Sequence, residues 1–123
     1  MSTYHAVVWM DHTEAHVLSF DREHVEGQKI RSRSHHKHQG KSGDATYFPA
    51  ISAALGGHHE VLLTGPGQAR EEFRAWVQKH QPEAAKLIVD SVASDHPSDA
   101  QIVALARKYF VRFDQMAGDP AVQ

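Results

Sequence analysis

The sequence contains no cysteine and no apolar run long enough to cross a bilayer. The lack of cysteine excludes disulfides, thiol nucleophiles and thiolate zinc sites. A membrane-spanning helix needs roughly 20 consecutive apolar residues, and no stretch of the chain approaches that length. The first residues, Met1 to His5, also lack the basic start and the apolar centre of a secretory signal. These absences favour a cytoplasmic protein with no membrane partner.

Acidic side chains are missing from one stretch of a chain whose charge is otherwise balanced. The whole sequence has 15 acidic and 13 basic residues, a formal net charge of −2, whereas residues 29–41 contain no acid. This basic segment carries Lys29, Arg31, Arg33, Lys37 and Lys41. A local run of this kind marks a charged surface patch on a protein that is not polycationic as a whole.

Length and composition predict one globular domain. With 123 residues, 41% hydrophobic and 23% charged, the chain can bury a core and is too apolar to be disordered. We predict a single domain over residues 1–123, with an ordered core at about 4–113, a flexible basic loop at 31–46 and a frayed tail at 117–123.

Hydrophobic patterning predicts three strands, followed by alternating helices and strands. Residues 6–10 are continuously apolar, as in a central strand covered on both faces, and residues 14–20 return as its hairpin partner. The polar residues 25–32 predict an edge strand. The later elements are a helix capped by Thr46 and ended by Gly56 and Gly57, a strand at 60–64, a helix stopped at Gln81-Pro82, a strand at 87–89, and a last helix opened by a capping box at 98–101. The order is βββαβαβα, with right-handed crossovers.

The stretch SHHKHQGKSGD, residues 34–44, has no apolar side chain to anchor it. His35, His36 and His38 are candidate ligands for a transition metal, but a structural zinc site requires four ligands, so partners from elsewhere in the chain would be needed. The other interpretations are a loop that contacts an anion and a loop with no function. We favour the anion-contacting loop. Its candidate contacts are Arg31, Arg33, His35, His36, Lys37, His38 and Lys41, with Gly40 and Gly43 providing flexibility.

Carboxylates provide a second candidate site. Asp11 follows the first strand and Asp90 lies in the fifth, and converging carboxylates on such a sheet hold the metals of two-metal nucleases. The candidate set also includes Asp95 and Asp99, near the last helix. Asp11 is followed by a turn, Asp95 precedes His96-Pro97 in a plausible turn, and Asp99 is a usual first-turn helix acid, so we prefer these structural explanations. The turn at residues 65–67 lacks the lysine and hydroxyl of a phosphate-binding P-loop, so we interpret it as simple turn geometry. The aromatic residues Phe73, Trp76, Tyr109 and Phe110 have helical spacing and are expected in the core.

Three segments carry a family resemblance. VVWMDHTEAHVLSF, LLTGPGQAREEF and DHPSDAQIVALARKYF resemble a group of short bacterial translational machinery proteins, which are related to the middle domain of eukaryotic and archaeal class I release factors and of Pelota. The resemblance covers about residues 4–113. It implies that HHKHQGKSGDATYF takes the place of the release-factor loop that carries Gly-Gly-Gln and reaches the peptidyl-transferase centre.

The Gly-Gly-Gln motif itself is absent, and its nearest pieces are Gln39-Gly40 and Lys41-Ser42-Gly43. We therefore expect no peptidyl-tRNA hydrolysis, as in Pelota, which also lacks the motif. The chain has no counterpart of the codon-reading or factor-binding domains of the family, so we do not expect stop-codon decoding.

Together these observations predict an α/β domain with a ribonuclease-H-like mixed sheet of five strands in order 3-2-1-4-5, strand 2 antiparallel to the rest, and helices on both faces. The predicted function is that of a non-enzymatic protein without a cofactor, associated with the ribosome or with structured RNA (ribosomal or transfer RNA). The alternatives are a metal-dependent nuclease using Asp11 and Asp90, and an adaptor that binds a metal or a partner through His35, His36 and His38. The oligomeric state is left open.

Overall fold

The computed structural model describes residues 5–21, 23–32 and 46–116. Its elements, in chain order, are β1 (His5–Met10), β2 (Glu14–Phe20), β3 (Val25–Arg31), α1 (Tyr47–Ala54), β4 (Glu60–Gly65), α2 (Ala69–His80), α3 (Pro82–Ala85), β5 (Ile88–Ala93) and α4 (Asp99–Met116). None of the helices among these residues is long and apolar enough to span a membrane.

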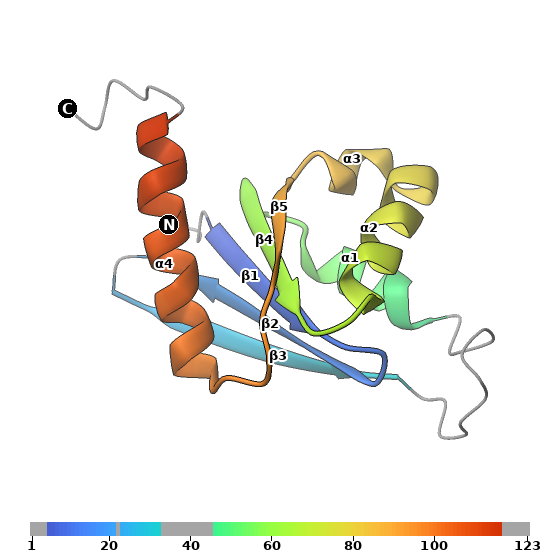
Figure 1. Ribbon diagram of the computed structural model, residues 1–123. Coiled ribbons are helices and arrows are strands. Elements are labelled where there is room, and N and C mark those ends of the chain that lie inside the picture. The colour runs from blue at the N-terminus through green and yellow to red at the C-terminus, as the bar shows by residue number, and fades with distance from the viewer. Residues whose placement is uncertain (1–4, 22, 33–45, 117–123) are drawn as a thin grey trace.

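The five strands form one mixed sheet in the order β3-β2-β1-β4-β5. β2 pairs antiparallel with β1 and with β3, whereas β1, β4 and β5 run parallel to one another. Helix α4 covers one face of the sheet, and α1, α2 and α3 lie on the other (Figure 1). The predicted strand order, the antiparallel second strand and the two helical layers are all confirmed.

β1 lies at the centre of the sheet and sends alternate side chains into two cores. Ala6, Val8 and Met10 pack with α1 and α2, and Val7 and Trp9 pack with α4. All five are at most 3% exposed. A strand covered on both faces has no polar face, which explains why residues 6–10 read as an unbroken apolar run.

Two elements at the carboxyl-terminal half differ from the prediction. β5 runs to Ala93, beyond the predicted end at residue 89. Its polar positions are retained in the strand because other elements bond them: Tyr109 donates to Asp90 and Arg70 donates to Ser91. Helix α2 ends at His80, in agreement with the stop predicted at Gln81-Pro82. The one-turn helix α3, which was not predicted, begins at Pro82, since proline is preorganised for a first helical position.

The two predicted helix caps had different outcomes. Ser98 and Gln101 form a reciprocal capping box, with each backbone N–H donating to the side-chain oxygen of the other residue, at 2.9 and 3.2 Å. Thr46 is the residue before α1 as predicted, but its backbone is helical rather than extended. It supports the helix through its carbonyl, which accepts a bond from the Ala50 N–H at 3.1 Å. The side-chain cap predicted for Thr46 was therefore wrong.

Candidate site at the base of the basic segment

Most of the predicted contact residues lie outside the residues that the structure describes. These are Arg33, His35, His36, Lys37, His38, Gly40, Lys41 and Gly43. Their roles, and the flexibility predicted for residues 31–46, stay predictions. The described part of the basic segment comprises Lys29, Ile30, Arg31 and Ser32, at the end of β3.

Two described residues on either side of the stretch 33–45, Ser32 and Tyr47, are bonded to the same turn, residues 11–13, which joins β1 to β2. On the outgoing side, the Ser32 N–H donates to the Thr13 carbonyl at 2.8 Å. On the returning side, the Tyr47 hydroxyl donates to the Asp11 carbonyl at 2.8 Å. The end of β3 and the start of α1 are therefore bonded to one turn.

The Tyr47 hydroxyl is suited to this role because it stays protonated. The residue is only 5% exposed. Burial, together with the nearby negative charges of Asp11 and Glu14, raises the pKa of Tyr47 far above its usual value. A phenol that does not ionise keeps its O–H as a donor, so the contact persists over the whole physiological pH range.

The turn is itself fixed by the Asp11 carboxylate. One oxygen accepts bonds from the Thr13 N–H, the Thr13 hydroxyl and the Glu14 N–H, at 2.8, 2.9 and 2.9 Å. Burial alone would raise the pKa of Asp11, but these hydrogen bonds and the nearby His96 more than offset it and lower that pKa below its usual value. Asp11 is thus ionised, and its carboxylate holds the turn through bonds to Thr13 and Glu14.

Gly65 packs the end of β4 directly against the end of β1. Its φ is +138°, and a Cβ at this position would collide with the Met10 carbonyl oxygen. Gly67 also has a positive φ, +65°, as the chain turns into α2. The turn at residues 65–67 is therefore explained by backbone geometry and close strand packing, in agreement with the turn interpretation preferred from the sequence.

The structure does not bring Asp11 and Asp90 together. Asp90 pairs in register with Leu62, and Leu62 pairs with Val7. Asp11 lies four positions beyond Val7, about 13 Å further along the sheet, and two strands away. Asp90 instead accepts bonds from the Tyr109 hydroxyl at 3.0 Å and from the Ser91 N–H at 2.8 Å.

Within residues 5–21, 23–32 and 46–116, no group of three or more histidines and carboxylates is arranged to hold a metal ion. The convergence of carboxylates that the nuclease alternative requires is thus not found in this part of the chain.

The basic side chains at the end of β3 point toward solvent. Arg31 is 68% exposed at its side chain, and its Nε lies 3.8 Å from the Glu14 carboxylate, a weak surface pair. Lys29 lies two positions earlier on the same face of the strand, opposite His16. Both cations remain accessible to a ligand that approaches the base of the basic segment.

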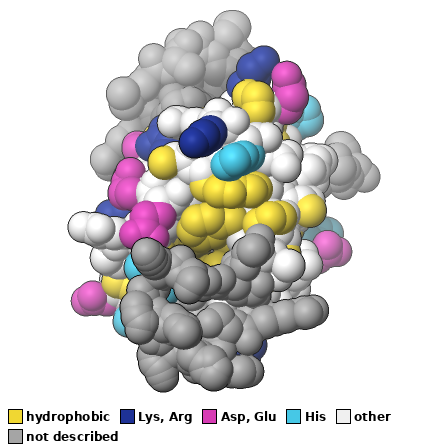
Figure 2. Space-filling view, turned by 90° about the vertical axis from the view of Figure 1, so that its right-hand side faces the viewer, with side chains coloured by type: hydrophobic (Ala, Val, Ile, Leu, Met, Phe, Trp, Pro, Cys, Tyr) yellow, Lys and Arg dark blue, Asp and Glu magenta, His cyan; other side chains and the backbone are white. Residues whose placement is uncertain are grey.

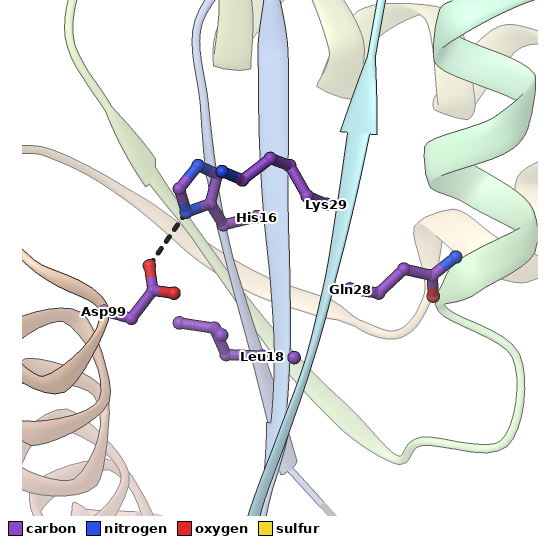
Figure 3. A pocket seen from close by; sticks show the side chains of 6 residues that line it. His16, Leu18, Gln28, Lys29 and Asp99 are labelled. Atoms are coloured by element: carbon purple, nitrogen blue, oxygen red, sulfur yellow. Dashed lines mark hydrogen bonds and ion pairs between the residues drawn. The ribbon is translucent and has the colours of Figure 1, made fainter.

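A hollow of about 250 Å³ lies beside Lys29, between β2, β3 and the start of α4, and its lining includes His16, Leu18 and Asp99 (Figure 3). The His16 ring is bonded on both sides, from Nδ1 to Asp99 at 2.8 Å and from Nε2 to Glu14 at 3.2 Å. Both ring nitrogens are bonded to protein carboxylates, and one of these, Asp99, belongs to α4. We therefore interpret this hollow as part of the structural contact between β2 and α4, and not as a ligand site.

The sequence did not predict the role of Tyr47, whose hydroxyl bonds the start of α1 to the turn at residues 11–13. The available signal was a tyrosine at the first position of a helix that follows directly on a polar stretch. Its partner, the Asp11 carbonyl, is 36 residues away in the chain, and a main-chain acceptor leaves no mark in the sequence.

The sequence matches no protein-family model and no curated protein. Solved structures do match. Pelota from Archaeoglobus fulgidus superimposes with a TM-score of 0.70 and 16% identity, over 99% of this chain and 35% of that one. Pelota from Thermoplasma acidophilum gives 0.61 and 23%, over 83% and 31%. The archaeal translation termination factor aRF1 gives 0.57 and 12%, over 95% and 41%.

A yeast protein has the same fold. Dom34 of S. cerevisiae, described as a translation termination-like factor involved in RNA quality control pathways, superimposes with a TM-score of 0.52 and 16% identity, over 76% of this chain and 30% of that one. The chain spans about a third of the length of these proteins. It therefore has the fold of one part of Pelota and of the archaeal release factor, which confirms the structural relationship that the resemblance implied.

Proposed function

We propose that this chain is a non-enzymatic protein of the translation machinery, which contacts RNA on or around the ribosome through the phosphates. The basic segment and the turn that holds it would form the contact. The observation that carries the proposal is that Ser32 and Tyr47, the described residues on either side of 33–45, are bonded to one turn, with the exposed Arg31 next to Ser32. The fold shared with Pelota, Dom34 and aRF1 supports the link to translation.

The chemistry of the basic segment suits a phosphate backbone. Lysine and arginine supply a salt-dependent attraction that does not depend on base sequence. Gly40 and Gly43 allow the backbone to approach the nucleic acid closely. No acid interrupts residues 29–41, so the attraction is not cancelled locally. The ligand we propose is structured RNA, ribosomal or transfer RNA, recognised by its backbone.

A catalytic role is not supported. The sequence lacks Gly-Gly-Gln, and Asp11 and Asp90 are each engaged in hydrogen bonds within the fold. The basic segment would thus act as a contact and not as a catalyst.

The test is the affinity for a labelled RNA stem-loop across a salt series. Lys37→Ala with Lys41→Ala removes two cations from the basic segment, and should lower the slope of log affinity against log salt by between about one and two. The matched control is Lys86→Ala with Lys108→Ala, which removes two exposed cations from the α3 and α4 regions. If both pairs change the slope equally, the basic segment is not the contact.

The same assay separates phosphate contact from metal binding by His35, His36 and His38. Imidazoles in general gain charge near pH 6.5, so RNA binding should strengthen modestly between about pH 7.5 and 6. Metal ligands must be neutral, so a metal-dependent contact predicts the opposite trend and loss of binding on addition of a chelator. Either of those results would favour the metal-binding adaptor.

A further inference from the structure

The outer edge of the sheet at β3 is open to another strand. β3 is the outermost strand on its side of the sheet, and no described strand pairs with its outer edge (Figure 1). It runs for seven residues without a proline, and every residue except Ile30 is exposed. β5, at the opposite edge, is mostly half-buried. An exposed strand edge of this length offers its backbone N–H and C=O groups to a further strand.

The hydrophobic side chains that Figure 2 shows on the side of α1 and α2 differ from this edge, because they have partners within the fold. Phe48 and Trp76 are partly buried and pack against the core, where both contact the ring of Phe73. Trp76 was expected in the core from its helical spacing, so its partial exposure departs from that prediction. The unsatisfied groups of the described domain are those of the β3 backbone.

The free backbone groups of β3 belong to alternate residues. At one end of the strand the Asp21 N–H donates to the His24 carbonyl at 3.0 Å, and at the other the Ser32 N–H donates to the Thr13 carbonyl at 2.8 Å. In an antiparallel pair, residues bonded to the neighbouring strand alternate with residues whose N–H and C=O point away from it. Both bonds use even-numbered residues of the β3 chain. The residues whose backbone groups point away from β2 are therefore Val25, Gly27, Lys29 and Arg31.

The side chains of this edge complement a second copy of the same edge. Two identical antiparallel edges are related by a twofold axis, so residues on the same face of the sheet meet. With Gly27 on the axis, Arg31 lies beside the exposed Glu23 of the second copy, and Lys29 lies opposite its Val25. The Val25 side chain, 47% exposed in the single domain, is then covered by the aliphatic part of the lysine.

The neighbouring registers that keep the same backbone bonding are less favourable. With Gln28 on the axis, Arg31 lies opposite Val25, and the two copies of Lys29 become diagonal neighbours. With Lys29 on the axis, the two ammonium groups face each other. Like charges across a strand pair are destabilising. Of the three registers, the one with Gly27 on the axis is the one that brings opposite charges together.

We propose that β3 pairs antiparallel with β3 of a second copy of this chain, which joins the two sheets into one across a twofold axis. The inference does not rest on the proposed function. Arg31 faces Glu23 in the pair, so the dimer and an RNA contact compete for this cation, and the tests therefore use the protein without RNA. An edge contact of this size is smaller than a standard interface, so we expect dissociation constants of about micromolar to millimolar.

Sedimentation velocity of the full chain at low salt, from about 1 μM to 1 mM, measures the association. Arg31→Glu and Glu23→Arg each place like charges at both symmetric contacts and should weaken the dimer about tenfold or more. The double variant with both changes restores opposite charges and should dimerise like the parent. Circular dichroism at the lowest concentration checks that each variant is folded.

The apolar contact has a matched control. Val25→Lys would face Lys29 of the second copy and should weaken the dimer. Val111→Lys makes the same change at a valine that is 60% exposed on α4, away from the edge, and should leave the association unchanged.

Amide hydrogen exchange locates the contact on the strand. The Gly27 and Lys29 amides point away from β2 and should become protected only at high protein concentration. The Gln28 and Ile30 amides are directed to β2 and should be protected at every concentration. A protein that stays monomeric throughout, a dimer that leaves Gly27 and Lys29 unprotected, or a double charge variant that fails to dimerise would each overturn the proposal. None of these results bears on RNA binding, so the proposed function is tested separately.

Discussion

The hydroxyl of Tyr47 and the main-chain carbonyl of Asp11 are 2.8 Å apart, and this contact ties the start of α1 to the turn between β1 and β2. The same turn receives the Ser32 N–H, at the end of β3, at its Thr13 carbonyl. Two separate bonds, from described residues on either side of 33–45, therefore end on one turn of three residues. The proposed function depends on that convergence, because it brings the end of β3, with the exposed Arg31, and the start of α1 to one turn.

Tyr47→Phe should test the hydrogen bond from Tyr47 to the Asp11 carbonyl with little change in packing. The ring stays in the core, and the Asp11 carbonyl loses its buried donor, so the free energy of unfolding should fall by about 1 kcal/mol in a urea titration. Hydrogen exchange at the Ser32 amide should remain slow, since its own bond to Thr13 is untouched. Equal acceleration of exchange at Ser32 would mean that the two anchors are not separate contacts.

Asp11→Asn should show that the charge of Asp11 stabilises the fold, through a change in how the stability depends on pH. The pKa of Asp11 is lowered in the folded state, so ionisation stabilises the fold above the unfolded pKa of about 3.9, and this contribution is lost as the pH falls through the folded value. The stability difference between the parent and Asp11→Asn should be constant from about pH 6 to 7 and shrink below about pH 4. Thermal unfolding at several pH values measures it. A difference that grows in acid would contradict the assignment.

Gly65→Ala should be among the most damaging single changes in the chain. Its Cβ would collide with the Met10 backbone at a φ of +138°, so relief requires β1 and β4, the two central strands, to separate. We expect a loss of more than about 3 kcal/mol, or failure to fold. Gly67→Ala is the control, since its φ is also positive but its Cβ would meet open space, and it should cost only about 1 kcal/mol. Equal tolerance of both changes would refute the packing argument.

The purified protein should neither release peptide from peptidyl-tRNA nor cut RNA in the presence of Mg²⁺ or Mn²⁺. The reason is the missing Gly-Gly-Gln and the separation of Asp11 from Asp90 across the sheet. Incubation of labelled RNA with each metal and gel analysis of the products measures the second activity. Cleavage that Asp11→Asn or Asp90→Asn abolishes would show that the nuclease alternative is correct.

The sheet could be predicted from the sequence because its strongest signals are local. The unbroken apolar runs of β1 and β4 predicted two adjacent central strands, and the spacing of Ser98 and Gln101 predicted a capping box that the structure contains. The continuation of β5 beyond Asp90 to Ala93 could not be predicted, because the polar side chain of Ser91 is bonded by Arg70 from another element.

The candidate site was predictable only in part. Charge marked the basic segment, since a run without acids is visible in the sequence itself. The contact between Tyr47 and Asp11 could not be predicted. Its acceptor is the backbone carbonyl of Asp11, and its donor is a tyrosine whose spacing also fits a core position. The partial exposure of Trp76 could not be predicted for a related reason. Helical spacing placed Trp76 and Phe73 on one side of α2, and only the packed structure separates the buried ring from the half-exposed one.

Co-sedimentation with ribosomes across a salt series tests the central claim most directly. The parent protein should pellet with ribosomes at low salt and be released progressively as salt rises, because the contact is to phosphates. Lys37→Ala with Lys41→Ala should be released at lower salt, and Lys86→Ala with Lys108→Ala should behave like the parent. If the parent stays in the supernatant at every salt concentration, or the two lysine pairs release together, the basic segment is not a ribosome contact and the proposed function is wrong.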